Sequence, residues 1–401
     1  MAGRRRRDYP HHIPVRIPEN SLENPSLNYL EEDTLKKATF VLATTIIAFC
    51  ATLVVWNSAI LAAPAANPAA LTATKFQVDP YWPKPLPDHW VTGEVGGTCV
   101  DAQDNVFIVT RGNLTPDEQR IATVAPPIIE FNPEGKVINS WGDRKVTPNG
   151  MHSCFVDYQG NVWVAGNHDG IVQKYSHDGS KLLLQIGTKG KFDTSDGTEN
   201  GAAMNSSHTL LNRPSSVFVD PSNGDVYISD GYGNRRVVVF DKDGHYLRQW
   251  GRQGTVAEAD AGVGGVFLAI VHCVVIGNDG LVYVCDRMSD RIQVFDKMGN
   301  FKRNIWVQKG SAKRTVIGSA WWLAFSRDPG QTLMYVVDGG DEVLWTLDHA
   351  TGKVLSGFGR PGHQVGEFSF EHTVAVDSKG NLFIGETING RRVQKFKPVV
   401  K

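Results

Sequence analysis

The sequence predicts an all-β fold, a six-bladed β-propeller preceded by a single transmembrane helix. Three observations predict it. A pattern of short apolar strands and polar turns recurs every 50 residues or so from Thr98 onward. The 41 glycines and 10 tryptophans suit many short strands and tight turns. An uncharged apolar run lies near the N-terminus.

The repeat has a strand, a turn with Asp, Gly or Asn, a second strand, a polar turn and a third strand. Its clearest copies are FVDYQGNVWVAG from Phe155, VFVDPSNGDVYISDGYGNRRVVVFDKDGHYLRQWG from Val217, VVIGNDGLVYVCDRMSDRIQVFDKMGNF from Val274 and VAVDSKGNLFIGETINGRRVQKF from Val374. One copy cannot bury both faces of its sheet, so neighbouring copies must pack face to face. Repeats of this length with three or four strands predict propeller blades.

Six blades are expected, and residues 76–401 make up the propeller. Their innermost strands are predicted to begin near Thr98, His152, Ser215, His272, Trp321 and His372. The last copy ends near Phe396, within its third strand, so FQVDPYWP from Phe76 is expected to supply the outer strand and close the ring. Residues 187–213 and 252–266 interrupt the pattern and are predicted to be loops over one mouth of the channel.

The N-terminal part divides into a cytoplasmic tail (1–38), a transmembrane signal-anchor (39–63) and a linker (64–75). The run 39–63 carries no charge and is long enough to cross a bilayer. Lys36 and Lys37 precede it, so the positive-inside rule predicts a single-pass protein with its propeller on the extracytoplasmic side. The alternative is a secretory signal cleaved among the small residues 62–66, which would release a secreted domain.

Charge and cysteine content narrow the class further. The formal net charge is −1, which gives no reason to expect a nucleic-acid partner. The five cysteines, at positions 50, 99, 154, 273 and 285, show no CxxC spacing. They are predicted to be buried free thiols, and a disulfide scaffold is not expected at this density.

Three histidines share one register in alternate blades. His152, His272 and His372 each stand at the start of an innermost strand, in blades two, four and six. A single histidine there is usually a hydrogen-bonded polar residue. Three of them about 120° apart converge on the channel axis and predict a tris-histidine metal site with an open fourth position. Zinc suits such a site, and iron, copper or nickel also bind imidazole.

Two further residues are expected to face this metal. Arg111 ends the second strand of blade one, and Tyr232 follows the second strand of blade three. Tyr232 is the candidate general base, and Arg111 is the candidate anchor for an anionic group. Either could equally be an ordinary turn residue. Arg287 in blade four and His168 in blade two are weaker candidates of the same kind.

With these residues in place, residues 76–398 resemble the peptidyl-α-hydroxyglycine α-amidating lyases, an NHL-type propeller family. The matching stretches are VTRGN around Arg111, MHSCFVDYQGNVWVAG around His152, RPSSVFVDPSNGDVYISDGYGNRRVVVF around Tyr232, VHCVVIGNDGLVYVCDRMSDRIQVF around His272 and FEHTVAVDSKGNLFIGE around His372. The resemblance implies zinc on His152, His272 and His372, with Tyr232 and Arg111 serving the chemistry.

The sequence also departs from the family. The resemblance implies a structural calcium held by an aspartate directly after the last histidine, and here that residue is Thr373. The carbonyl oxygens of Thr98 and Cys154 remain as candidate calcium ligands. A methionine of the family's pocket wall is Phe370 here. These differences bear on the substrate more than on the metal.

Two functions follow from the sequence. The first is a zinc lyase that cleaves the C–N bond of a peptidyl- or acyl-α-hydroxyglycine-like carbinolamide to an amide and glyoxylate. The second is a non-catalytic exported propeller that binds a protein or cell-envelope partner. Calcium-dependent propeller lactonases would need a cluster of carboxylates and amides in the channel, and none stands at equivalent registers.

Overall fold

The computed structural model describes residues 72–310 and 317–399, which belong to the unit Leu71–Lys401. The predicted tail, the predicted anchor and residues 64–71 of the linker lie outside these residues. Within the described ranges, no helix is long and apolar enough to cross a membrane.

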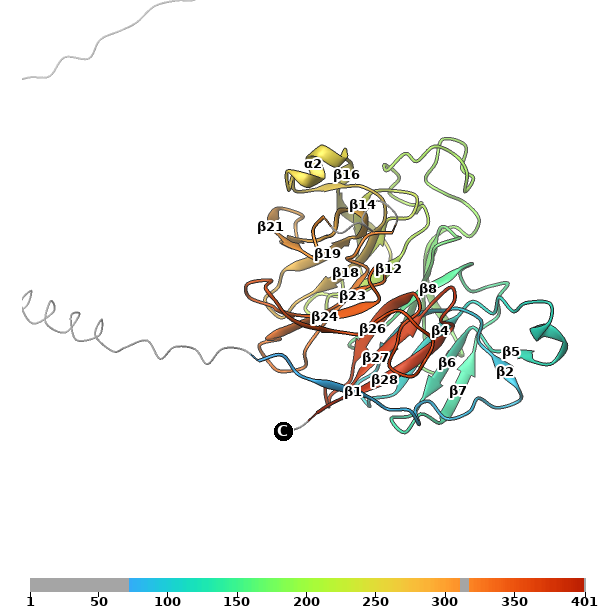
Figure 1. Ribbon diagram of the computed structural model, residues 1–401. Coiled ribbons are helices and arrows are strands. Elements are labelled where there is room, and N and C mark those ends of the chain that lie inside the picture. The colour runs from blue at the N-terminus through green and yellow to red at the C-terminus, as the bar shows by residue number, and fades with distance from the viewer. Residues whose placement is uncertain (1–71, 311–316, 400–401) are drawn as a thin grey trace, which may run out of the picture. The chain divides into compact units, whose positions relative to one another are not determined.

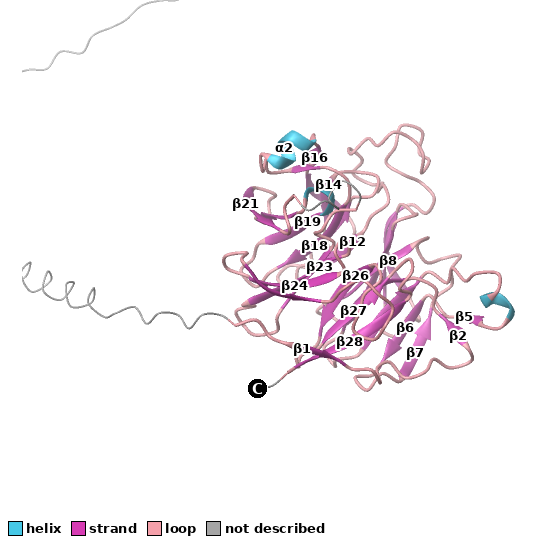
Figure 2. Cartoon of the chain, viewed as in Figure 1, coloured by secondary structure: helices cyan, strands magenta, loops and turns pink. Residues whose placement is uncertain are grey.

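Six antiparallel four-stranded sheets form the blades (Figures 1 and 2). Blade one contains β3 (Val95–Val100), β4 (Val106–Thr110), β6 (Ile128–Phe131) and β7 (Val137–Trp141). Blade two contains β8 (Met151–Val156), β9 (Val162–Gly166), β10 (Ile171–Tyr175) and β11 (Leu182–Gly187). Blade three contains β12 (Ser216–Val219), β13 (Val226–Asp230), β14 (Arg236–Phe240) and β15 (Tyr246–Trp250). Blade four contains β18 (Val271–Ile276), β19 (Val282–Asp286), β20 (Arg291–Phe295) and β21 (Phe301–Trp306). Blade five contains β22 (Trp322–Phe325), β23 (Leu333–Asp338), β24 (Val343–Asp348) and β25 (Val354–Phe358). Blade six contains β26 (Glu371–Val376), β27 (Leu382–Glu386), β28 (Arg392–Pro398) and β1 (Phe76–Val78). Each innermost strand contacts the innermost strands of both neighbouring blades, so the six form a closed ring.

The first strand of the chain closes the ring, as predicted. β1 pairs antiparallel with β28, with Phe76 opposite Pro398 and Val78 opposite Phe396. In Figure 1 the blue β1 lies beside the red β28. Phe76 packs against Tyr335 and Phe358 of blade five, at centroid distances of 5.6 Å each. The closing strand therefore contributes apolar contacts as well as backbone hydrogen bonds.

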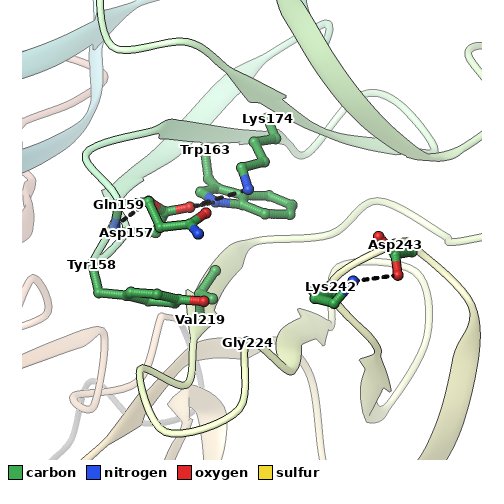
Figure 3. Close-up of a pocket in the computed structure, with 9 residues that line it drawn as sticks. All are labelled: Asp157, Tyr158, Gln159, Trp163, Lys174, Val219, Gly224, Lys242 and Asp243. Carbon is green, nitrogen blue, oxygen red and sulfur yellow. Dashed lines mark hydrogen bonds and ion pairs between the residues drawn. The ribbon is translucent and has the colours of Figure 1, made fainter.

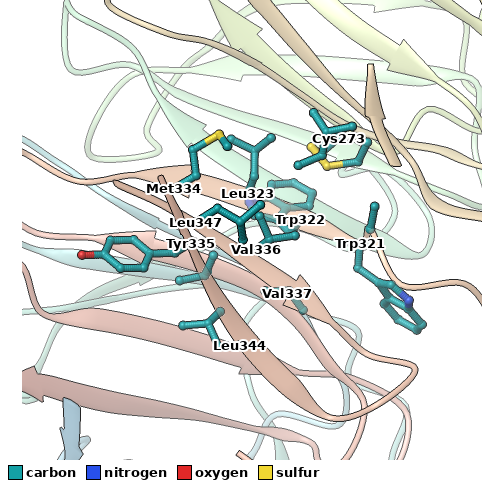
Figure 4. Close-up of a cluster of buried hydrophobic side chains, with 14 of the residues drawn as sticks. Cys273, Trp321, Trp322, Leu323, Met334, Tyr335, Val336, Val337, Leu344 and Leu347 are labelled. Atoms are coloured by element: carbon teal, nitrogen blue, oxygen red, sulfur yellow. A yellow bond between two sulfur atoms is a disulfide. The ribbon is translucent and has the colours of Figure 1, made fainter. Parts of the chain in front are cut away.

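The hydrophobic core lies between adjacent blades, because each sheet buries both faces. The largest cluster joins blades four, five and six, and Figure 4 shows part of it. β23 illustrates the pattern, since all six of its residues are buried. Sheets covered on both faces have near-continuous apolar strands.

The prediction of free thiols is wrong for the four described cysteines. Cys99 is bonded to Cys154, which joins the innermost strands of blades one and two, and Cys273 is bonded to Cys285 across β18 and β19. The Cα atoms are 5.7 Å and 4.9 Å apart, within the range for disulfides. Cys273 and Cys285 are direct cross-strand partners, so the sheet register itself brings them together. Cys50 lies outside the described residues.

An ion pair recurs in three blades, fully buried in two of them, and explains part of the repeat. An acidic residue ends the second strand, and an arginine begins the third. The pairs are Asp230–Arg236 at 2.9 Å, Asp286–Arg291 at 2.8 Å and Glu386–Arg392 at 2.7 Å. Each pair ties adjacent strands together where they meet at the blade end.

The two long interruptions differ in structure. Residues 188–215 contain no strand apart from an isolated bridge between Thr194 and Ala203. Residues 252–266 were predicted to be a loop, and they contain short regular elements. β16 (Arg252–Gln253) pairs in parallel with β17 (Val266–Phe267), and α2 (Val256–Asp260) lies between them. Thr255 and Glu258 form a capping box that stabilises the start of α2.

Blade one carries an insertion of its own. β2 (Trp90–Val91) pairs in parallel with β5 (Thr123–Val124), and a 3₁₀ turn, η1 (Glu118–Arg120), precedes β5. A second 3₁₀ turn, η2 (Arg287–Ser289), follows β19 in blade four. We call the end of the channel at which the innermost strands begin the mouth. In an antiparallel blade the second strand ends at this same mouth, so η2 lies there together with the histidines.

Candidate metal centre

The three histidines lie on β-bulges at the mouth. The ladder between the first and second strands skips one residue in each of their blades, and that residue is His152, His272 or His372. A bulge bends the strand and re-aims a side chain. Because the bulge falls at the same position in each of the three blades, it re-aims the three imidazoles in the same way, toward the channel.

The imidazoles form one compact cluster. Their ring centroids are 4.8 Å apart for His152 and His272, 4.4 Å for His152 and His372, and 5.0 Å for His272 and His372. Each offers a nitrogen within 4.8 Å of the other two, and all three side chains are buried. The sequence prediction that these residues meet is confirmed.

Backbone carbonyls of the intervening blades hold the three rings. His152 Nδ1 lies 2.8 Å from the carbonyl oxygen of Ser215, His272 Nδ1 lies 2.6 Å from that of Trp321, and His372 Nδ1 lies 2.7 Å from that of Gly96. A carbonyl only accepts, so each Nδ1 carries the hydrogen and each Nε2 keeps its lone pair. Histidine blades and carbonyl blades thus alternate around the ring, which explains why every second blade has a histidine.

One detail of the predicted register is wrong. In blade one the residue equivalent to the histidines is Gly96, not Thr98, because the bulge in β3 falls at Gly96. A side chain is excluded there: a Cβ on Gly96 would lie 1.9 Å from the carbonyl oxygen of Met151. Glycine lets blades one and two approach closely while its carbonyl holds His372.

The cluster fits a divalent metal ion. His152 Nε2 and His372 Nε2 lie 3.1 Å apart, close to the roughly 3.3 Å expected between two nitrogens bound tetrahedrally to zinc at 2.0–2.1 Å. Two lone pairs at this distance need a cation or a proton between them. Burial disfavours the proton, because it lowers the pKa of His152 and of His272 well below 6.5 and that of His372 to about 3. Neutral imidazoles with free Nε2 atoms are the form that binds metals.

Tyr232 lies against the same cluster, as predicted. Its hydroxyl is 3.0 Å from His152 Nε2 and 3.4 Å from His272 Nε2. Arg213 lies over the face of the ring, with its Cζ atom 5.8 Å from the centroid. The phenolic oxygen thus lies within hydrogen-bonding distance of two of the three imidazole Nε2 atoms.

Arg111 reaches the mouth in an ion pair that the sequence did not predict. Its positive charge contributes to lowering the pKa of each histidine of the cluster. One of its terminal nitrogens lies 2.5 Å from Glu94 Oε2, and its Nε donates to the carbonyl of Met151 at 3.1 Å. Glu94 also accepts hydrogen bonds from Thr387 and Asn113. Arg111 is therefore held in place, with part of its hydrogen-bonding capacity already used.

Arg287 lies closer to the histidine cluster than the sequence suggested. It is 9% exposed and lies close enough to Tyr232 for the two side chains to interact. Its Cζ atom lies 3.8 Å from the ring centroid of Trp321, and its Nε donates to the carbonyl of Ile317. Burial lowers the pKa of Arg287, and the interaction with Tyr232 opposes that shift. The tyrosine thus has a guanidinium partner from blade four.

The other predicted positions lie around this centre in different ways. Phe370 has a φ of 54° and is half-buried against the hydrophobic cluster of blades four to six. His168 is exposed at the rim, where it pairs with Glu199 at 3.1 Å. The Thr98 and Thr373 hydroxyls are 3.1 Å apart and bond to each other. A threonine pair brings no negative charge, whereas calcium sites in proteins are usually built with carboxylates.

Two pockets lie near these strands, and they differ in their relation to the centre. A hollow of about 110 Å³ opens beside Arg111 and is also lined by Met151 and Arg144. A larger pocket of about 190 Å³ lies between blades two and three (Figure 3). Asp157 and Lys242, which line it, follow the far ends of β8 and β14, so it contains none of the predicted site residues. The lining of the Arg111 hollow includes Met151, the residue directly before His152.

Fold and site define a six-bladed propeller with a candidate tris-histidine metal centre at one mouth. The sequence pattern of the NHL repeat family matches residues 211–240, which include most of the blade that carries Tyr232. The chain is 27% identical to NHL repeat-containing protein 3 of Homo sapiens over 343 residues, covering 81% of this chain and 84% of that protein. It is 27% identical over 280 residues to peptidyl-alpha-hydroxyglycine alpha-amidating lyase 1 of Drosophila melanogaster, covering 65% of this chain and 47% of that enzyme. The relatives thus include amidating lyases, which confirms the resemblance seen in the sequence.

Solved structures agree on the fold. A streptogramin B lyase superposes with a TM-score of 0.50 at 13% identity, covering 81% of this chain and 98% of that one. At this identity the similarity concerns the propeller fold alone.

Proposed function

We propose that the protein is a zinc-dependent lyase that cleaves the C–N bond of a peptidyl- or acyl-α-hydroxyglycine-like carbinolamide. The observation that carries the proposal is the position of the Tyr232 hydroxyl, 3.0 Å and 3.4 Å from two of the three clustered Nε2 atoms. This juxtaposes a proton acceptor with a candidate metal centre. The similarity to amidating lyases supports the same assignment.

Zinc held by His152, His272 and His372 would supply a Lewis acid for the substrate hydroxyl and the developing carbonyl. The propeller supplies the rest. The Nδ1–H groups bonded to carbonyls fix the ring orientations, and burial keeps the imidazoles neutral. No histidine then has to move or lose a proton before it can serve as a ligand.

Tyr232 serves as general base in its phenolate form, and Arg287 stabilises that negative charge. The phenolate accepts the proton of the carbinol hydroxyl, the C–O bond becomes a carbonyl, and the C–N electron pair leaves with nitrogen. The amide nitrogen then takes the proton from Tyr232. The products are a primary amide and glyoxylate, with no change in redox state.

Arg111 is proposed to hold the substrate carboxylate. It borders the hollow that Met151 also lines, and a guanidinium binds a carboxylate in a charge-assisted, often bidentate, manner. Its ion pair with Glu94 fixes the direction of the side chain. The carboxylate would then bind to the guanidinium nitrogen that Glu94 and Met151 leave free.

The decisive experiment is a glyoxylate-release assay on the purified, zinc-loaded protein with an N-acyl-α-hydroxyglycine. We expect glyoxylate and amide in equal amounts, and loss of turnover when zinc is removed by a chelator. A metal-loaded protein that releases no glyoxylate above the uncatalysed rate would favour the second function, an exported NHL propeller that binds a protein or cell-envelope partner.

We also propose that the propeller is exported and stays tethered through residues 39–63. Two disulfides in the propeller support export, because disulfides persist in oxidising compartments. A mature N-terminus near residue 65, found by mass spectrometry, would replace the tether by a cleaved signal. Reduced cysteines in the protein isolated from cells would contradict export itself.

A further inference from the structure

A lysine stands at the same register, near a buried aspartate, at the far end of two blades. In blade two Asp157 follows the innermost strand, and Lys174 of β10 lies 3.5 Å from its Oδ2 atom (Figure 3). In blade six Lys395 of β28 holds the equivalent position; the charge of Asp377 raises its pKa against the effect of burial, and its Nζ atom donates to the carbonyl of Pro133 at 3.1 Å. The register is the same, since Lys174 pairs with Trp163 and Lys395 with Phe383 in their second strands.

Blade one reverses the charge at this position. Glu130 of β6 pairs with Phe107, so it occupies the register of the two lysines, and it faces Asp101 at the end of β3. The two residues are 4% and 5% exposed. Among the described residues, no lysine or arginine forms an ion pair with either of them. Two buried carboxylates without a cation are unfavourable, and burial together with Asp101 raises the pKa of Glu130.

A histidine from blade two completes the group. His177, in the turn after β10, places Nε2 3.0 Å from Asp101 Oδ2, with its ring edge-on to Phe107 at 5.4 Å. The same turn position holds Lys297 in blade four, which pairs with Asp220 of the neighbouring blade at 2.5 Å. Here the ring that replaces the lysine has a nitrogen able to coordinate a metal.

We propose that Asp101, Glu130 and His177 form a second divalent-metal site, of the type that binds zinc, clamping blade one to blade two. Their ligand atoms all lie within 4.8 Å of one another. One imidazole nitrogen and two carboxylate oxygens are an ordinary ligand set for zinc. The metal would take the place that the ammonium group of Lys174 fills in blade two.

The surroundings prepare Asp101 for this role. Its Oδ1 atom accepts the backbone N–H groups of Gln103 and Asn105 at 2.8 Å and 2.7 Å, which fixes the carboxylate. Its Oδ2 atom faces His177 and also accepts from the Asn105 amide at 3.0 Å. The His177 side chain is 40% exposed, so water can fill the remaining coordination positions. The group lies at the end of β3 opposite the mouth and is independent of the proposed lyase activity.

The test counts zinc ions per chain in the full protein, by titration of the metal-free form and by elemental analysis. Wild type should bind two, and Glu130→Gln and His177→Gln should each bind one and keep the central site. The matched control is His245→Gln, which removes an exposed histidine 3.0 Å from Asp241 and should still bind two. A single zinc in wild type, or two in Glu130→Gln, would overturn the proposal.

A charge-restoring variant separates metal binding from mere stability. Glu130→Lys recreates the pairing of Lys174 with Asp157, so it should fold, bind one zinc and show a melting temperature that no longer rises when the second equivalent is added. In wild type the second equivalent of zinc should raise the melting temperature. A site that fills with calcium but not zinc would contradict the role of the imidazole, since calcium prefers oxygen ligands. A wild-type melting temperature unaffected by the second equivalent of zinc would show that this group does not hold a metal.

Discussion

Arg287 lies over the indole of Trp321, with its Cζ atom 3.8 Å from the ring centroid. The carbonyl of the same tryptophan accepts the Nδ1 hydrogen of His272. One residue of blade five thus holds both a metal-ligand candidate and the guanidinium that contacts Tyr232. Trp321 therefore links Arg287 to the metal centre: its indole ring packs on the guanidinium, and its backbone carbonyl holds His272.

Replacing Tyr232 with Phe should separate metal binding from catalysis. The variant loses the proton acceptor and keeps all three imidazoles, so we expect full zinc content and a fall in kcat of about a hundredfold or more. Elemental analysis and the glyoxylate assay measure the two quantities. His272→Ala is the comparison, because it should lower both. Wild-type turnover in Tyr232→Phe would reject the base while leaving the metal centre intact.

The two arginines should differ in kinetic effect. Arg287→Lys keeps the charge but loses the planar group over Trp321, and we expect kcat to fall by about tenfold to a hundredfold, the value of a charge-assisted hydrogen bond. Arg111→Lys should mainly raise KM, because we assign it to substrate binding. Steady-state kinetics distinguish the two outcomes. An unchanged kcat in Arg287→Lys would remove this residue from the proposed mechanism.

The metal-free protein should lose stability in acid. Burial depresses the folded-state pKa of all three histidines below their ordinary 6.5, to about 3 for His372. As the pH falls below 6.5, the unfolded chain takes up protons that the folded protein does not, so the free energy of unfolding decreases. Urea denaturation at pH 7 and pH 5 measures the change, and His372→Gln should show a smaller one. An equal loss of unfolding free energy between pH 7 and pH 5 in the two proteins would contradict the contribution assigned to His372.

The two disulfides should contribute unequally to stability. Cys99 and Cys154 are 55 residues apart in sequence, whereas Cys273 and Cys285 are 12 apart. Loop-closure entropy gives about 4 kcal/mol for the first and about 3 kcal/mol for the second. Chemical denaturation of the Cys→Ser pairs compares them, with zinc content as a check on the fold. A larger loss for the shorter loop would show that packing, not chain entropy, dominates.

The closing strand should be needed for the whole ring. Phe76→Ala removes the ring that packs on Tyr335 and Phe358, and we expect a loss of about 1–3 kcal/mol, because the side chain is half-buried. Gln77→Ala, on the exposed side of the same strand, is the matched control and should be nearly neutral. Thermal denaturation measures both. Equal effects would mean that β1 contributes backbone pairing alone.

The sequence predicted the propeller and its central site because both depend on repetition. Equivalent positions in successive blades face the same axis, so the common register of His152, His272 and His372 was sufficient. The bulges were not predicted, because a bulge is a feature of pairing between strands. For the same reason Thr98 was placed where Gly96 lies.

Contacts between blades were the part that the sequence did not yield. The Cys99–Cys154 bond joins residues with no local spacing signal, and its formation depends on how closely blades one and two approach. The Glu94–Arg111 pair and the Asp101–Glu130–His177 group likewise join different strands or blades. One signal was available for the last of these. Glu130 stands in the repeat position at which Lys174 and Lys395 stand, a charge reversal that alignment of the blades would have shown.

The pairing of β1 with β28 brings Phe76 opposite Pro398, so the two ends of the propeller are neighbours. A hydrogen bond from the Val399 amide to the Lys75 carbonyl extends the contact. A short linker could therefore join these ends, and the chain could be reopened between any two blades without altering which sheets touch. The ring of blades does not depend on where the chain begins, so a circularly permuted protein should assemble the same metal centre.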